Sequence, residues 1–425
     1  ANLLLPRMLA RAGLSGPDAA LATELTYGTL RREGTYDAII ADAAGRPVSA
    51  IDPTVLDALR LGAHQLLAMR TPTHAAVNET VRQVRQAAGK PASGFANAVL
   101  RRVSERSRDA WLERLDAAAR SDDERLALRY AHPVWVIRAF RRALAAEDRS
   151  EELEALLDAD NASPTVTLAA LPGLAERPAD AAPTPYSPIG FRSAGGDPGA
   201  VVAASDGRIR VQDEGSQLAA LALARAVPVA PGEVWLDLCA TPGGKTAVLA
   251  AEALAHGARL EANELSPARA GLVRDSVAGV PLEVPVSEED GRVRAGRGKY
   301  DRILVDAPCT GLGALRRRPE ARWRKQPADV PALAALQTEL LDAAVAALKP
   351  GGIVAYVTCS PHLAETAGIV AEVLRTHEGD LEELDARAVV AGVAERDIDL
   401  ADAAGSLRAQ LWPHRHGTDA MSISL

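Results

Sequence analysis

The sequence predicts an α/β protein in which a mostly parallel sheet, covered by helices on both faces, follows an all-helical domain and a small α+β subdomain. Three observations carry this prediction. Apolar residues recur at three- and four-residue steps over the first hundred residues, strand-like and helix-like segments alternate towards the C-terminus, and proline, glycine and alanine accumulate between these regions. The expected parts are a helical domain at 1–105, a helical linker at 106–150, an α+β subdomain at 151–213 and the sheet domain at 214–425.

Length and composition limit the class of protein. A chain of 425 residues can form two or three domains with separate cores. Its hydrophobic fraction of 48% and charged fraction of 24% are those of a soluble globular protein, and its apolar runs are shorter than the roughly 20 residues that span a bilayer. We therefore expect a cytoplasmic monomer without a membrane segment or a secretory signal. The net charge of −8 argues against non-specific coating of nucleic acid.

The cysteines predict thiol chemistry. Cys239, Cys309 and Cys359 are too few for a disulfide framework, and their spacing fits no zinc site, so no metal is expected. A lone cysteine is usually core filling. Each of these three, however, lies in a segment with other chemistry-bearing residues, which favours reactivity.

The first domain is expected to consist of helices, with helical periodicity over Ala20–Leu30, Val55–Met69 and Val77–Val103. Two of its segments, Thr73-His-Ala-Ala-Val-Asn-Glu-Thr-Val81 and Gly94-Phe-Ala-Asn-Ala-Val-Leu-Arg-Arg-Val103, resemble the RNA-binding helical domain of the NusB transcription-antitermination family. The resemblance implies that this domain binds RNA.

The C-terminal domain is expected to alternate strands and helices. The strand candidates are Val234–Ala240, Leu260–Leu265, Leu282–Val286, Arg302–Ala307 and Ile353–Thr358. The helix candidates are Gly244–Ala255, Pro267–Val277, Pro331–Leu348 and Leu363–His377. Ligands of such sheets bind beyond the carboxyl ends of the strands, so functional residues should follow directly after them.

A glycine turn follows the first of these strands. Asp237-Leu-Cys-Ala-Thr-Pro-Gly-Gly-Lys-Thr246 opens a helix, whose positive end suits an anionic or carboxylate-bearing ligand. The alternative is the phosphate loop of a nucleoside triphosphatase, because Gly244-Lys245-Thr246 matches the end of that motif, but Cys239 replaces its first glycine. Glu264 can bind ribose hydroxyls, and Asp290 can reach an adenine edge. Together they favour an adenosine-bearing cofactor.

Two thiols and a carboxylate follow the next strands, in Asp306-Ala-Pro-Cys309 and Thr358-Cys359-Ser360. They suit methylation at carbon 5 of cytosine, a poor nucleophile that requires a thiolate to add first at carbon 6. An acid near N3 would stabilise the charge that develops on the ring. This chemistry predicts that one thiol attacks, the other assists and Asp306 contacts the base, but it leaves the order of the thiols open.

These motifs resemble the RNA cytosine-5 methyltransferases, and the NusB-like domain narrows the likeness to the bacterial small-subunit rRNA family of the RsmB or Sun type. The likeness covers nearly the whole chain, extending to Tyr130–Trp135, Asn161–Pro164, Val211–Gln217, Leu315–Pro319 and His414–Asp419. It implies a Rossmann-like domain that uses S-adenosylmethionine to methylate small-subunit rRNA.

The resemblance also implies roles for residues. Cys359 would be the nucleophile, Cys309 would promote product release and Asp306 would lie between cofactor and base. Two positions depart from the family pattern: Thr241 stands where alanine is common, and Glu264 replaces an aspartate. The residues implied in cofactor binding are Cys239, Ala240, Thr241, Pro242, Gly243, Gly244, Lys245, Glu264, Asp290 and Asp306.

A basic run between Arg292 and Lys325 holds eleven basic residues against three acidic ones. Such a run can be a solvated face or a phosphate-binding surface. The resemblance favours phosphate contacts by Arg316, Arg317, Arg318 and Arg322 with an RNA whose target base is unpaired or flipped. A remaining alternative is a non-catalytic RNA-binding factor with a decayed methyltransferase domain, although the loop, both thiols and Asp306 are intact.

Overall fold

The computed structural model describes residues 4–294, 298–403 and 405–425, and the chain forms two compact units. The helical unit comprises Ala1–Arg141, Leu153–Ala162 and Leu315–Arg324. The sheet unit comprises the remaining segments, 142–152, 163–314 and 325–425. The chain therefore returns to the helical unit for ten residues after the Pro-Cys motif. Arg297, a member of the basic run, lies outside the described residues.

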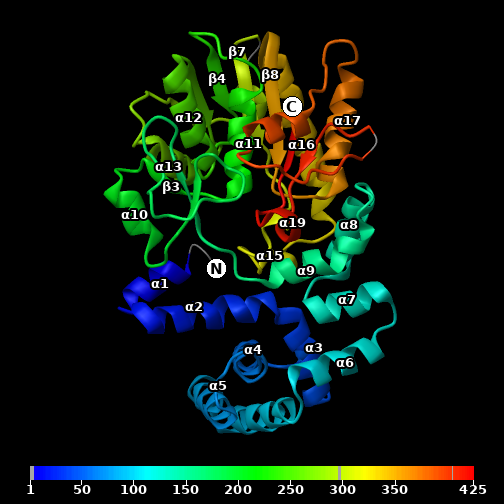
Figure 1. Ribbon diagram of the computed structural model, residues 1–425. Coiled ribbons are helices and arrows are strands. Elements are labelled where there is room, and N and C mark those ends of the chain that lie inside the picture. The colour runs from blue at the N-terminus through cyan, green and yellow to red at the C-terminus, as the bar shows by residue number, and fades with distance from the viewer. Residues whose placement is uncertain (1–3, 295–297, 404) are drawn as a thin grey trace. The chain divides into compact units, whose positions relative to one another are not determined.

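The helical unit has a core formed by Tyr36, Ile39, Leu59, Leu100 and Trp111, all buried. Local sequence explains where its helices begin and break. Asp52 caps α4 by accepting hydrogen bonds from two backbone N–H groups, ahead of a proline at the first helical position. Its helices (Figure 1) are α1 (Leu5–Arg11), α2 (Gly16–Arg31), α3 (Glu33–Ala44), α4 (Pro53–Leu67), α5 (Thr73–Ser104, kinked at Gly89), α6 (Arg108–Ala118), α7 (Asp122–Tyr130), α9 (Leu153–Asn161) and α15 (Ala321–Arg324).

Along the chain, α8 (Val134–Ala145) leads from the helical unit into the sheet unit. A small antiparallel sheet follows in the order β2-β1-β3. Its strands are β1 (Thr167–Ala170), β2 (Gly190–Arg192) and β3 (Ile209–Val211), accompanied by α10 (Pro198–Ala204). This is the α+β region expected from the proline- and glycine-rich segment.

The main sheet has the strand order β6-β5-β4-β7-β8-β10-β9, and its first five strands are parallel. The predicted strand at Leu282–Val286 is reduced to two residues, because Pro281 and Pro285 lack the N–H group that a ladder needs. The antiparallel β9 and β10 were not predicted, since they are too short for a periodic pattern. The strands are β4 (Val234–Asp237), β5 (Arg259–Asn263), β6 (Val286–Ser287), β7 (Tyr300–Asp306), β8 (Leu348–Thr358), β9 (Ala409–Gln410) and β10 (Ser422–Ser424).

Helices cover both faces of this sheet, as the α/β prediction requires (Figure 1). Successive strand residues point to opposite faces, so Trp235 joins one hydrophobic core and Leu236 the other. The first face carries α11 (Glu214–Arg225), α12 (Gly244–His256) and α18 (Ala386–Val393), with α13 (Pro267–Val277) beside α12. The second carries α14 (Gly291–Arg294), α16 (Asp329–Ala347) and α17 (Ala367–Thr376).

Helix α16 is apolar because it forms part of the core. Within the described residues it is the one helix long and apolar enough, by length and composition, to cross a membrane. In the structure its Leu340, Leu341 and Ala344 are buried in the cluster that includes strands β7 and β8. Packing on the sheet therefore accounts for its composition.

Candidate active site

The strand register gathers the predicted functional residues at one edge of the sheet. β4 pairs with β5 and β7, and β7 pairs with β8 so that Asp306 lies opposite Val357. The carboxyl ends of these parallel strands therefore meet. Cys309 and Cys359 each follow one of two neighbouring strands.

The glycine loop after β4 is tied to both neighbouring strands. The N–H of Leu238 donates to the Leu304 carbonyl at 2.9 Å, and the N–H of Ala240 donates to the Asn263 carbonyl at 2.9 Å. Gly243 has a φ of 98°, and a Cβ there would lie 2.5 Å from the Cβ of Ser276. Only glycine fits this turn.

Helix α12 begins at this loop and offers hydrogen-bond donors to a ligand. Its first backbone bond runs from Ala247 N to Gly243 O, so the N–H groups just before Ala247 have no acceptor in the described part of the chain. The buried hydroxyl of Thr241 likewise has no partner there. These donors at a positive helix end fit the carboxylate of an amino-acid-bearing cofactor such as S-adenosylmethionine.

Lys245 is engaged inside the protein. Its Nζ lies 2.8 Å from Oδ2 of Asp306, and both residues have mostly buried side chains. Burial lowers the pKa of Lys245, but the attraction of Asp306 outweighs it, so the pKa is raised overall and the lysine is charged. A phosphate-binding lysine would instead face the ligand alone. This ion pair is a second departure from a phosphate loop, besides Cys239.

The sulfur atoms of Cys309 and Cys359 lie 3.5 Å apart. Their electrostatic surroundings differ. Cys359 helps to raise the pKa of Lys245, so the ammonium group of Lys245 lies near the sulfur of Cys359. The pKa of Cys309 is raised well above its usual value by its hydrogen bond to Cys359, by burial and by the nearby carboxylate of Glu365. Cys239 is also held neutral, because burial and surrounding carboxylates raise its pKa.

Glu365 joins the two loops that carry these thiols, and no motif in the sequence singles it out. Its buried carboxylate accepts hydrogen bonds from Thr310 N at 2.7 Å and Thr310 Oγ1 at 2.5 Å, beside Cys309. It also accepts one from Ser360 Oγ at 2.7 Å, beside Cys359. One carboxylate therefore fixes the residues that follow both cysteines.

Glu264 and Asp290 lie after β5 and β6, as predicted. Glu264 is 5% exposed, and its carboxylate accepts from Ser266 N at 3.0 Å and lies 3.1 Å from Arg269. Hydrogen bonds from Arg292 lower the pKa of Asp290 to about 2, so this carboxylate is ionised. Their contacts with a cofactor stay predictions.

The prediction of a phosphate contact is wrong for Arg322. This side chain is 0% exposed, and burial lowers its pKa to about 10. Its guanidinium is used inside the helical unit, donating to the oxygens Arg31 O, Ala131 O, Asn161 Oδ1 and Asp160 O at 2.7–3.2 Å. Contacts of Arg316, Arg317 and Arg318 with RNA stay predictions, and among these three Arg318 is the exposed residue.

In the described ranges, no group of three or more His, Cys, Asp or Glu side chains is placed to hold a metal ion. The remaining features agree with one another. A doubly wound sheet, a glycine loop after its first strand and acidic residues after the next two define a Rossmann-like, S-adenosylmethionine-dependent methyltransferase.

Comparison with known proteins gives the family. Residues 224–425 match the family described as 16S rRNA methyltransferase RsmB/F, and residues 1–105 match the NusB family. Over 431 residues the chain is 50% identical to Rv1407 of Mycobacterium tuberculosis, a protein whose printed name describes it provisionally as a methyltransferase. This match covers 99% of this chain and 91% of that protein. Over 402 residues it is 34% identical to ribosomal RNA small subunit methyltransferase B of Pseudomonas putida, covering 91% and 85%. The chain belongs to this small-subunit methyltransferase B family.

A solved structure gives the same fold. The crystal structure of PH0851 superimposes with a TM-score of 0.78 and 22% sequence identity, covering 99% of this chain and 92% of that one. At this level of identity the similarity concerns the fold alone. The comparisons confirm the predicted family, fold class and cofactor.

Proposed function

We propose that this protein transfers a methyl group from S-adenosylmethionine to carbon 5 of a cytosine in small-subunit rRNA, with Cys359 as the nucleophile and Cys309 promoting product release. The observation that carries the proposal is the 3.5 Å separation of the two sulfur atoms beside the Lys245–Asp306 ion pair. Two thiols at this distance can both reach one pyrimidine ring. The name of the Pseudomonas putida relative supports the choice of rRNA as substrate.

The reaction begins with addition of the Cys359 thiolate to carbon 6 of the cytosine, which makes carbon 5 nucleophilic. S-adenosylmethionine supplies the electrophilic methyl group. We propose that Asp306 stabilises the negative charge that addition creates by donating a proton to N3, a proton that the neighbouring ammonium group of Lys245 can supply. The proton on carbon 5 must then leave to a base, and the bond between carbon 6 and sulfur must break. Cys309, next to the departing sulfur, assists this release.

The surroundings of the thiols support this division of roles. A nearby cation favours a thiolate, and Lys245 is the cation that interacts with Cys359. Cys309 instead faces Glu365 and the other thiol, and both keep it protonated. These surroundings support Cys359 as the attacking thiol.

The substrate and cellular setting follow from the same proposal. The NusB-like match at residues 1–105 supports RNA binding by the helical unit. The target cytosine must be unpaired or flipped, because carbon 6 of a stacked base is closed to a side chain. We propose that the protein acts in the cytoplasm as a monomer, without a metal or a membrane.

Two alternatives predict different results. A nucleoside triphosphatase should hydrolyse ATP in a Lys245-dependent manner, which the ion pair with Asp306 disfavours. A non-catalytic RNA-binding factor should fail to bind S-adenosylmethionine in a calorimetric titration, although its glycine loop is intact.

Methylation of rRNA tests the proposal directly. Small-subunit rRNA from cells lacking the gene should lose bisulfite protection at one cytosine, and the purified protein should restore it with S-adenosylmethionine in vitro. Mass spectrometry of the digested product should place the methyl group on carbon 5. A methyl group on N4 or on the ribose would contradict the mechanism, and complete absence of transfer to rRNA would contradict the substrate.

A further inference from the structure

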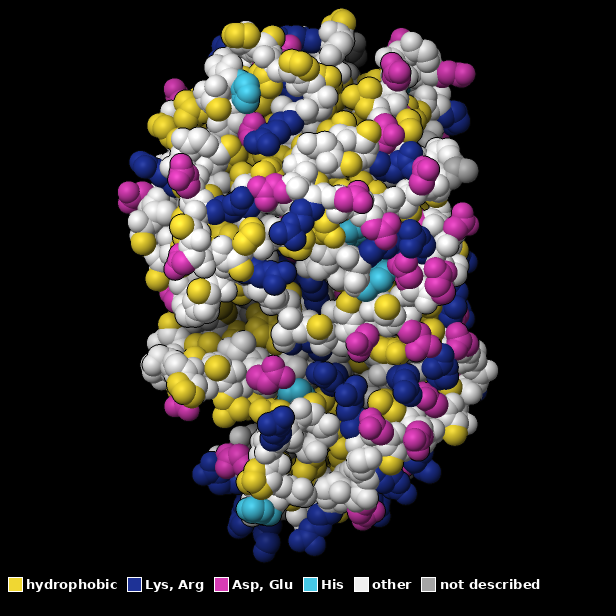
Figure 2. All heavy atoms as spheres, in the orientation of Figure 1, with side chains coloured by type: hydrophobic (Ala, Val, Ile, Leu, Met, Phe, Trp, Pro, Cys, Tyr) yellow, Lys and Arg dark blue, Asp and Glu magenta, His cyan; other side chains and the backbone are white. Residues whose placement is uncertain are grey.

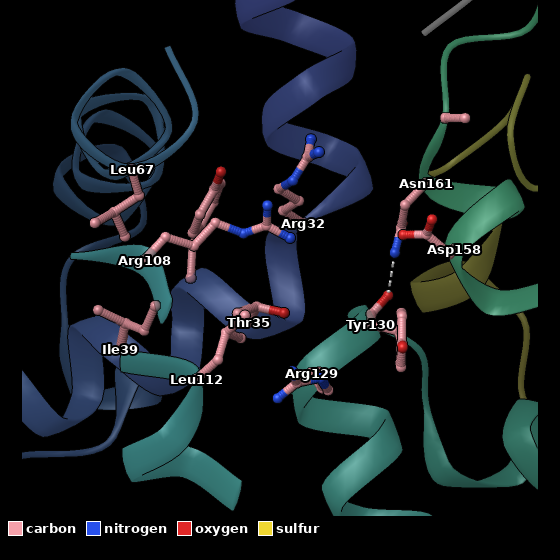
Figure 3. A pocket seen from close by; sticks show the side chains of 12 residues that line it. Arg32, Thr35, Ile39, Leu67, Arg108, Leu112, Arg129, Tyr130, Asp158 and Asn161 are labelled. Carbon is pink, nitrogen blue, oxygen red and sulfur yellow. Dashed lines mark hydrogen bonds between the residues drawn. The ribbon is translucent and has the colours of Figure 1, made fainter. Parts of the chain in front are cut away.

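A cavity of about 190 Å³ opens in the helical unit, and residues at the ends of several helices line it. Arg32 lies between α2 and α3, Arg108 begins α6, and Tyr130 ends α7. The end of α9 contributes Asp158 and Asn161. Figure 3 shows the guanidinium of Arg108 pointing towards Arg32 and towards the side of the cavity formed by Tyr130 and Asn161.

The residues that line the cavity carry an excess of positive charge. Within the described ranges, the guanidinium groups of Arg32 and Arg108 have neither an ion pair nor a hydrogen bond, whereas Arg129, which also lines the cavity, pairs with Asp116. Tyr36 lies on the cavity wall, and burial raises the pKa of its phenol. The charges of Arg32 and Arg108 act to lower that pKa, which shows that both guanidinium groups lie near the phenol. Two unpaired cations facing one cavity favour an anion.

This positive cavity is a local feature. Over the part of the sheet unit that faces the viewer in Figure 2, Lys and Arg side chains are interspersed with Asp and Glu. A chain of net charge −8 has little general attraction for polyanions. A specific cavity is therefore a better candidate for anion binding than a broad surface.

A carboxylate lies among the lining residues together with the arginines. Asp158 is exposed and, within the described ranges, forms no ion pair or hydrogen bond of its own side chain. A ligand that uses all three residues needs an anionic group for the arginines and a hydroxyl donor for Asp158. The volume also requires a group larger than a water molecule, which needs only roughly 10–15 Å³ on the same scale.

We propose that this cavity binds a ribose phosphate of the RNA substrate, with the phosphate on Arg32 and Arg108 and the ribose 2′-hydroxyl donating to Asp158. This inference rests on the proposed function, because it takes the substrate to be RNA. Arginine forks match phosphate oxygens, and a 2′-hydroxyl contact distinguishes RNA from DNA.

The buried Arg322 helps to shape this site. It donates at 2.7 Å to Oδ1 of Asn161, whose Nδ2 donates at 2.8 Å to the carbonyl of Tyr130. The two residues on the wall of the cavity are thereby fixed to each other and to the core of the unit. This part of the wall is held in place before a ligand arrives, so it need not be ordered on binding.

The test compares the full-length protein with the double variant Arg32→Gln/Arg108→Gln in filter binding to transcribed small-subunit rRNA at several salt concentrations. Loss of this one phosphate contact should reduce the slope of log K against log salt by about 0.7, the value per neutralised phosphate of single-stranded RNA. The matched control is Arg85→Gln/Lys90→Gln, which removes two exposed cations from α5, a helix that contributes no residue to the cavity. The control should keep the wild-type slope. Urea unfolding shows whether each variant is folded.

Asp158→Ala should reduce the preference for RNA over DNA of the same sequence, and the double variant should raise KM for rRNA at unchanged kcat. A wild-type slope in the folded double variant would overturn the proposal even if the wild-type enzyme methylates cytosine. Arginine-dependent binding of ribose 5-phosphate that rRNA does not displace would overturn it in favour of a small metabolite. If wild-type protein binds rRNA with the expected arginine dependence but transfers no methyl group, the cavity proposal stands and the proposed function fails.

Discussion

Cys309 and Cys359 bring their sulfur atoms within 3.5 Å of each other from the ends of two neighbouring parallel strands, although they are fifty residues apart in sequence. Their neighbours differ: Lys245 interacts with Cys359, and Glu365 with Cys309. If the two thiols had the same surroundings, replacing either cysteine should leave the other able to take its role. Because their surroundings differ, we expect the two substitutions to give different results.

Cys359→Ala should abolish methyl transfer, because the other thiol within reach of the ring, Cys309, has a raised pKa and stays protonated. We expect a loss of roughly 10³-fold or more in the transfer of tritiated methyl groups to rRNA. Binding of S-adenosylmethionine, measured by calorimetry, should stay unchanged and serves as the control for folding. Activity close to that of the wild type would assign the nucleophile to another residue.

Cys309→Ala should instead trap the enzyme on its product. The thiolate of Cys359 can still add and the methyl group can still transfer, but release of the sulfur slows. A covalent enzyme–RNA species should therefore appear as a shifted band on a denaturing gel, and it should require both S-adenosylmethionine and Cys359. If the double variant Cys309→Ala/Cys359→Ala gave the same band, the adduct would not involve Cys359.

Glu365→Gln should slow the attack step without weakening cofactor binding. The carboxylate accepts hydrogen bonds from Thr310 and Ser360, so a neutral amide loosens both thiol loops. We expect adduct formation in the Cys309→Ala background to fall roughly 10- to 100-fold, since small displacements of reacting groups have effects of this size.

The matched control for this variant is Glu372→Gln, which changes an exposed glutamate paired with Arg375 on α17. Its adduct should form at the rate of the Cys309→Ala parent. Equal rates for the Glu365 and Glu372 variants would show that Glu365 does not position the thiols.

The sequence predicted the part of this site that depends on strand ends. Apolar strand runs followed by the glycine loop, Pro-Cys and Thr-Cys motifs place their residues at one sheet edge whatever the details of packing. Glu365 could not be predicted, because Glu365 and Glu372 differ only in what the fold packs around them. Arg322 was misassigned for the same reason, since a run of arginines does not reveal which side chain enters a core.

Stability should depend on pH through Asp237. Burial raises the pKa of this carboxyl group from 3.8 to about 7, against the hydrogen bond from Thr246. Between these two pKa values the folded protein holds a proton that the unfolded chain releases, so the free energy of unfolding falls as pH rises through this window. Below the window the contribution is fully present, and above about 7 it is lost.

Asp237→Asn mimics the protonated carboxyl group and lacks this titration. Its free energy of unfolding in urea, relative to wild type, should therefore rise between pH 4 and pH 7 and level off above. Asp380→Asn, at an exposed position, controls for the loss of a carboxylate. A difference between the Asp237 variant and wild type that is independent of pH would contradict the raised pKa.

Arg322 and Arg318 should give opposite results, although they lie four residues apart. Arg322→Ala removes a buried guanidinium that donates to four oxygen atoms, so we expect it to lower the free energy of unfolding of the helical unit by roughly 3–5 kcal/mol. Arg322→Lys should rescue little, because one ammonium group cannot span those acceptors.

Arg318→Ala should change stability by less than about 0.5 kcal/mol, since the side chain is exposed. If Arg318 contacts a phosphate, its loss should lower the salt slope of rRNA binding by about 0.7. Urea unfolding and filter binding on the same two proteins check both expectations. A contrary result would be an Arg322→Ala protein that unfolds at the wild-type urea concentration and has a reduced salt slope of rRNA binding. Arg322 would then contact RNA and would not stabilise the core, because loss of a core side chain should lower the free energy of unfolding.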